Sequence, residues 1–195
     1  AFVNDFPLLV HHMKVTLVEA SLGLGMGVIL GFLVAIIMDM FEFFYKSIYP
    51  ILIITQTIPT VAIAPLLVLW LGYGILPKIV LIVLTSFFPI TIGLLDGFKS
   101  ADKDALKLMK TMGATPFQNF VHIKLPSSIG YFFAGLRISV SYSIIGAVVA
   151  EWLGGFDGLG VYMTRVRKSY SFDKMFAVIF LISIISLFLM FVVKK

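Results

Sequence analysis

Polar side chains that could act on a solute or a proton stand out here because most of their neighbours are apolar. The chain of 195 residues is 60% hydrophobic and 13% charged, whereas a soluble domain carries about 25% charged residues. The candidate groups are Glu19 within an apolar run, the pair His11-His12, the sequence "TQTIPT" at 55–60 and the basic segment "KTMGATPFQNFVHIKLP" at 110–126.

These residues give little support for an enzymatic function. His11 and His12 are adjacent, and neighbouring positions on a helix do not share a face, so they do not predict a metal pair. The sequence has no cysteine, which excludes a thiolate nucleophile and a disulfide framework. No P-loop, Gly-x-Ser-x-Gly motif or pair of carboxylates occurs in the apolar runs. We therefore expect no catalytic residue, no metal site and no bound cofactor.

Long uncharged runs predict an all-α, polytopic bundle of membrane helices. A helix needs about 20 apolar residues to cross a bilayer. The sequence predicts five spans, at about 15–38, 47–71, 76–95, 127–150 and 175–193.

The first predicted span carries a small residue at every fourth position, which predicts close packing against another helix. Glu19 falls on the same face. Its carboxylate could face the bundle or an aqueous cavity, or lie near the helix end at the membrane interface, and we favour the interface. The ridge consists of Gly23, Gly27, Gly31 and Ala35.

The second predicted span contains Pro50, Pro59 and Pro65, which predict a bent or interrupted helix. Irregular backbone at membrane depth is tolerated where protein or a water-filled cavity satisfies its polar groups. The polar residues here could therefore line a translocation pathway, or bond to the kinked backbone and neighbouring helices; both alternatives remain open. The pathway candidates are Thr55, Gln56, Thr57, Pro59 and Thr60.

The segment 96–126 reads as a helical hairpin between two spans. Gly113 permits a left-handed helix stop, and Thr115 can cap a second short helix with Pro116 in its first turn. Phe117 and Phe120 share an apolar face with Val121. A short amphipathic helix of this kind docks into a groove on a partner or lies on the membrane surface.

One motif in this hairpin resembles a known family. Gly113 is followed, after nine residues, by Ile123-Lys124-Leu125-Pro126, which is similar to the cytoplasmic loop of permease subunits in ATP-binding cassette importers. The Glu-Ala-Ala that usually precedes the glycine is replaced by Lys107-Leu108-Met109. The stretch "QTIPTVAIAPLLVLWLGYGILPKI" at 56–79 resembles the branch that serves nitrate, sulfonates, taurine and thiamin-pyrimidine or riboflavin-type precursors.

The resemblance implies a single transmembrane permease domain over 1–195, within a six-span core that has one further helix before residue 1. It implies a cytoplasmic coupling loop at 96–126 and an external loop at 151–174, with a short helix and with Glu151 facing a solute-binding protein. The basic residues of the loops give only a weak bias toward this orientation. The coupling residues would be Gly113, Ala114, Thr115, Pro116, Phe117, Phe120, Ile123, Leu125 and Pro126.

The resemblance also implies partners and a location. They are a cytoplasmic ATP-binding subunit that binds the ATP, an extracytoplasmic substrate-binding protein, a second permease copy, membrane lipid and no nucleic acid, in the inner membrane of a bacterium. The solute would be a thiamin pyrimidine or other vitamin precursor, with sulfonate, taurine or nitrate next. The alternative is an ion-coupled secondary transporter, which would need inverted repeats and a midplane ionisable residue. No internal repeat is visible, and Glu19 is the only acidic candidate well inside an apolar run.

Overall fold

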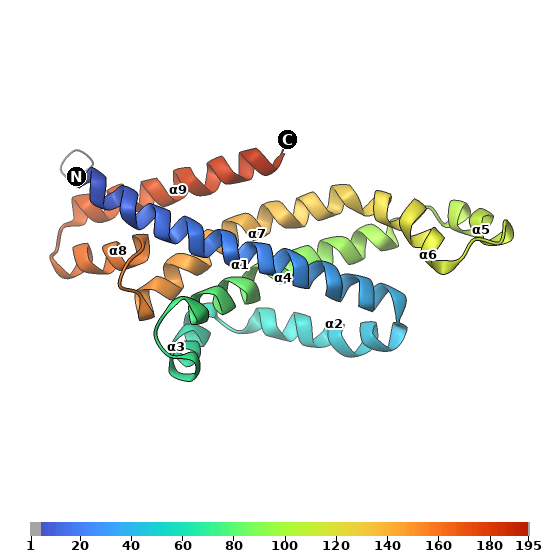
Figure 1. The fold of residues 1–195 in the computed structure, drawn as a ribbon, viewed down its shortest axis with the longest axis horizontal. Helices are drawn as coiled ribbons and strands as arrows, with labels where there is room; N and C mark the ends of the chain where they lie inside the picture. Colours follow the sequence, from blue (N-terminus) through green and yellow to red (C-terminus); the bar gives the residue numbers. More distant parts are fainter. Residues whose placement is uncertain (1–4, 195) are drawn as a thin grey trace.

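The structure is a computed structural model that describes residues 5–194, and within that range every element is helical (Figure 1). This confirms the predicted all-α class. The elements are α1 (Phe6–Met40), α2 (Glu42–Thr57), α3 (Thr60–Leu71), α4 (Ile75–Lys99), α5 (Lys103–Thr111), α6 (Pro116–Asn119), the π-helical turn η1 (Phe120–Lys124), α7 (Leu125–Gly154), α8 (Leu159–Lys168) and α9 (Phe172–Lys194).

Four helical segments in the described range are long and apolar enough to cross a membrane on their own: α1, α4, α7 together with α6 and η1 before it, and α9. The pair α2 and α3 passes the same test together but is bent by 101°. Each predicted span falls on one of these five segments. The helices run past the predicted ends; α1, for instance, begins at Phe6, because backbone hydrogen bonding continues beyond the apolar stretch.

Glycines bring α1 and α4 close together along the ridge that the sequence predicts. A side chain at Gly23 would overlap Ile82, and one at Gly27 would overlap Ser86. Gly135 of α7 approaches the carbonyl oxygen of Pro89 in α4 in the same way. Small residues thus let α4 pack closely against both α1 and α7.

The break between α2 and α3 lies at two residues with extended backbone, Ile58 and Pro59. Proline fixes its own φ and pushes the preceding residue away from the helical region. Pro50 and Pro65 lie inside α2 and α3 without ending them. The predicted interruption is confirmed, and it comes from one of the three prolines.

Two small helical units lie at opposite ends of the long axis of the molecule (Figure 1). The helices α5 and α6 extend beyond the bundle at one end, which we call the hairpin end. The helix α8 lies at the other end, which we call the α8 end. Helices α4 and α7 connect these two regions.

Candidate functional site: a helical hairpin and a cavity at a broken helix

Gly113 ends α5 in a left-handed conformation, with φ of 82°. The N–H of Ala114 donates to the carbonyl of Met109 at 2.9 Å, and that of Gly113 donates to Lys110 at 3.1 Å. These two bonds form a Schellman stop, whose left-handed residue is most often glycine because it lacks a Cβ. The position therefore favours glycine for a backbone reason.

Thr115 starts α6 with a complete capping box. The N–H of Gln118 donates to Thr115 Oγ1 at 3.3 Å, and the N–H of Thr115 donates to Gln118 Oε1 at 2.8 Å. Pro116 occupies the first turn, where its missing N–H costs nothing. The helix is thus preformed, although it is only four residues long.

The two phenylalanines of the predicted apolar face point to different surroundings. Phe117 is 71% exposed. Phe120 makes an edge-on contact with Phe98 of α4, with ring centroids 5.2 Å apart, and packs with Leu125 against the same apolar core. Of the two, only Phe117 is free to contact a partner, while Phe120 attaches the hairpin to the bundle. The π-helical turn that starts at Phe120 changes the helical register, and no sequence pattern predicts it.

An ion pair holds the hairpin to the far end of α1. The Lys124 ammonium lies 2.9 and 2.8 Å from the two carboxylate oxygens of Asp39. Both side chains are largely buried, at 27% and 13% exposed. Sequence reasoning missed this pair because the residues are 85 positions apart.

Next to the α2–α3 break lies a cavity of about 510 Å³. Thr55, Gln56, Pro59 and Thr60 line it, whereas Thr57 is absent from the lining. The Thr57 hydroxyl instead donates to the carbonyl of Ile54 at 2.8 Å. Thr55 both lines the cavity and donates to the carbonyl of Leu52, so lining a cavity and bonding to the backbone do not exclude each other in this segment.

Helices α4 and α7 supply most of the remaining cavity lining, which sequence reasoning does not assign. Thr85 and Tyr142 add hydroxyl groups, and Phe87 adds an aromatic ring. Among the described residues that line the cavity, none is charged. The cavity is therefore an apolar site with a few hydroxyls and one amide, a composition typical of sites for small organic molecules.

Glu19 lies inside the bundle, where it is 4% exposed. Its Oε1 accepts a hydrogen bond from the Lys78 ammonium at 2.6 Å. Glu19 therefore faces the bundle, which is the less favoured of the two alternatives that the sequence allows. The glycine ridge brings its face against α4, and the first turn of α4 supplies the lysine that neutralises it.

Glu151 also points inward and is 1% exposed, within the last turn of α7. The expectation that it faces a solute-binding protein is wrong for the side chain. One carboxylate oxygen lies 2.7 Å from Thr16 Oγ1, and the other accepts from the N–H of Gly160 at 2.6 Å. The predicted short helix does exist in 151–174, as α8.

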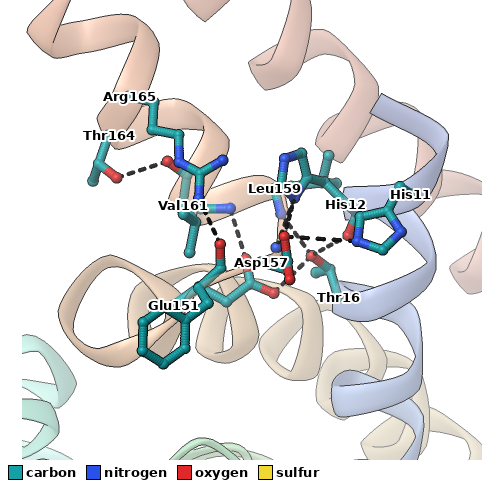
Figure 2. Close-up of polar contacts among 12 residues, drawn as sticks. His11, His12, Thr16, Glu151, Asp157, Leu159, Val161, Thr164 and Arg165 are labelled. Carbon is teal, nitrogen blue, oxygen red and sulfur yellow. Dashed lines mark hydrogen bonds and ion pairs between the residues drawn. The ribbon is translucent and has the colours of Figure 1, made fainter. Parts of the chain in front are cut away.

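Three successive backbone N–H groups at the start of α8 donate hydrogen bonds to side chains of α1 and α7 (Figure 2). The N–H of Gly158 donates to His12 Nδ1 at 3.0 Å, and that of Leu159 donates to Thr16 Oγ1 at 2.9 Å. Glu151 Oε2 accepts the third hydrogen bond, from the N–H of Gly160. We call this arrangement the α8 clamp, and it satisfies donors that a helix cannot satisfy itself.

Asp5, at the start of α1, ties the other side of α8 to α9. It accepts from Lys174 at 2.6 Å and from the Tyr162 hydroxyl at 3.0 Å. The hydrogen bond from Lys174, with a further one from Tyr162, holds the pKa of Asp5 below its ordinary value. Burial, together with the Asp5 carboxylate, raises the pKa of Tyr162 to about 12, so this hydroxyl stays neutral.

With this architecture in place, comparison with known proteins identifies the family. Residues 27–195 match the family described as the binding-protein-dependent transport system inner membrane component. The chain belongs to this family. It is a permease of an ATP-binding cassette importer and a multi-pass protein of a bacterial inner membrane, in a family where a partner ATPase hydrolyses the ATP.

Individual relatives of the permease differ in the solute that their names give. A formylaminopyrimidine transport permease (ThiX) of Halalkalibacterium halodurans is 40% identical over 184 residues, which are 94% of this chain and 74% of the relative. A probable ABC transporter permease of Haemophilus influenzae is 42% identical, covering 94% and 75%. A putative aliphatic sulfonates transport permease (SsuC) of Bacillus subtilis is 28% identical, covering 89% and 63%.

Solved structures share the fold of the permease. The MetNI methionine ABC transporter superposes with a TM-score of 0.81 at 18% identity, covering 98% of this chain and 95% of the other. An amino acid ABC transporter crystallised with histidines gives a TM-score of 0.77 at 15% identity, covering 100% and 92%.

Proposed function

We propose that the permease pairs with a second copy of itself to form the translocation pathway for a small, uncharged, ring-bearing solute, with a thiamin pyrimidine or related vitamin precursor as the leading candidate. A solute-binding protein delivers the solute from outside. ATP binds to a cytoplasmic ATPase partner, whose closure moves the hairpin end and shifts the bundle between inward-open and outward-open states.

The observation that carries the solute class is the uncharged lining of the cavity at the α2–α3 break. An anion such as a sulfonate or nitrate is held best by charge-assisted hydrogen bonds from lysine or arginine, and the lining offers none. A pyrimidine needs an apolar surface, a ring to stack on and a few hydrogen-bonding groups. Phe87, Tyr142 and Gln56 lie around the cavity in a way that fits this need.

Uptake by proteoliposomes that contain the complete importer tests the cavity assignment. Gln56→Ala removes the amide from the lining and is expected to weaken uptake of a formylaminopyrimidine about tenfold, the factor that about 1.4 kcal/mol represents. Thr57→Ala is the matched control because its neighbouring hydroxyl bonds to Ile54 instead. Equal uptake by both variants, or preferred uptake of a sulfonate by the unchanged permease, would argue against the proposed solute.

The support for ATPase docking is Phe117, exposed on a capped helix outside the bundle. Phe117→Asp is expected to stop the permease from co-purifying with its ATPase in detergent. Leu108→Asp places the same charge on α5, at a residue 62% exposed, and is expected to leave the complex intact. A Phe117→Asp permease that still elutes with the ATPase would contradict docking through α6.

A further inference from the structure

Two buried carboxyl groups share one buried ammonium group near the α8 clamp. Glu19, Glu151 and Lys78 are 4%, 1% and 6% exposed. Lys78 bonds to Glu19 and lies beside the backbone of Gly155, one turn after Glu151. If both carboxyl groups were ionised, the cluster would carry a net negative charge away from water, which is strongly unfavourable.

The hydrogen bonds of Thr16 favour a neutral Glu151. Its Oγ1 lies 2.7 Å from Glu151 Oε1 and 3.1 Å from the carbonyl oxygen of His12, and it accepts from the N–H of Leu159. A hydroxyl group has one proton to donate and two lone pairs to accept with. If Glu151 is ionised, both Glu151 Oε1 and the His12 carbonyl oxygen can only accept, and the single hydroxyl proton of Thr16 points at one of them. If Glu151 is protonated on Oε1, it donates to Thr16, and Thr16 donates to His12, so both contacts are true hydrogen bonds.

The neighbouring ionisable groups do not supply a second cation. His12 Nδ1 accepts from Gly158, so its proton is on Nε2 and the ring is neutral. Arg165 is exposed and donates to the carbonyl of Phe156 at 2.7 Å. Asp157, which is near both His11 and His12, is half exposed and adds only negative charge.

We infer that Glu151 is a proton-binding site: the neutral acid donates to Thr16 and accepts from Gly160, while Glu19 stays ionised beside Lys78. The proton lets the first turn of α8 dock on α1 and α7 without burying a net charge. Glu151 is thus a positioning residue for α8. This assignment rests on the α8 clamp and on the Glu19–Lys78 pair, and it does not depend on the solute or on ATPase docking.

Infrared spectroscopy of the purified permease in lipid at neutral pH tests the assignment directly, through the carbonyl band of a protonated carboxylic acid. We expect this band in the unchanged permease and its loss in Glu151→Gln. Absence of the band in the unchanged permease, or its survival in Glu151→Gln, would overturn the inference. Thr16→Val, below, decides which of the two carboxyl groups holds the proton, because Thr16 bonds to Glu151 and not to Glu19.

Thermal unfolding of the same variants gives a second readout. Glutamine has the shape of a neutral glutamic acid, and its amide can donate to Thr16 while its oxygen accepts from Gly160. Glu151→Gln should therefore unfold close to the unchanged permease, whereas Glu19→Gln leaves Lys78 buried without its partner and should unfold at a clearly lower temperature. A Glu151→Gln permease that unfolds early or fails to fold contradicts a neutral Glu151.

Thr16→Val leaves Glu151 unchanged and tests whether Glu151 is the donor in its hydrogen bond with Thr16. It removes the hydroxyl that accepts from Glu151, so the carboxylic acid band should move to a higher frequency. A band that keeps its position in Thr16→Val would show that Glu151 does not donate to Thr16, and would overturn the inference.

Discussion

Gly113 and Gly130 allow a matched comparison at the scale of single residues. An added Cβ would meet nothing within 4 Å at either position, and only Gly113 has a left-handed backbone. Gly113→Ala should lower the free energy of unfolding by about 1 kcal/mol and reduce ATP-driven uptake. Gly130→Ala, inside α7, should raise the free energy of unfolding by up to about 1 kcal/mol.

Denaturant titration in detergent and uptake in proteoliposomes measure both glycine variants. If Gly113→Ala matched Gly130→Ala in stability and in uptake, the left-handed stop would have no bearing on coupling.

Residue roles could be predicted from the sequence where they depend on local spacing. The cap at Thr115, the stop at Gly113 and the small-residue ridge each follow from the positions of a few residues along one helix. The pairs Glu19–Lys78 and Asp39–Lys124, and the clamp contact of Glu151, join residues far apart in the chain. Nothing local indicates these partners, because helix packing alone determines which faces meet.

At the scale of elements, the break between α2 and α3 depends on Pro59. Pro59→Ala restores a backbone N–H and frees Ile58 to become helical, so α2 and α3 can join into a straighter helix that closes the cavity. We expect uptake to fall about tenfold, as a shift of about 1.4 kcal/mol toward a closed form would produce. Uptake of radiolabelled solute measures this effect.

Pro50→Ala is the control for that change, since Pro50 lies within α2 and does not end it. Replacing it should leave uptake unchanged and raise the free energy of unfolding, by at most about 3 kcal/mol. Equal uptake by the two proline variants would mean that the bend does not shape the pathway.

The existence of the broken span could be predicted from its prolines, but the cavity beside it could not. Four helices line that cavity, and two of them, α4 and α7, contribute residues such as Thr85 and Tyr142 from separate spans. The π-helical turn η1 was equally invisible. Both depend on how the spans pack together.

At the scale of the whole molecule, the Asp39–Lys124 pair joins the end of α1 to the start of α7. Asp39→Lys and Lys124→Asp should each lower the free energy of unfolding, and each should weaken ATP-driven uptake. The double exchange should recover about 1 kcal/mol of that loss, the size of a favourable ion-pair coupling. A double-mutant cycle measures the coupling, and strictly additive losses would rule out an energetic role for the pair.

The helix α7 runs without interruption for 30 residues, from the end of η1 to the last residue before the loop that leads to α8. At the usual rise it is about 45 Å long, with the hairpin attached at its base and Glu151 near its tip. A stiff rod of that length acts as a lever: a tilt of about 5° at the base moves the tip by about 4 Å. A partner that shifts the hairpin only slightly would thereby move α8, which is fastened to the tip, by more than the length of a hydrogen bond.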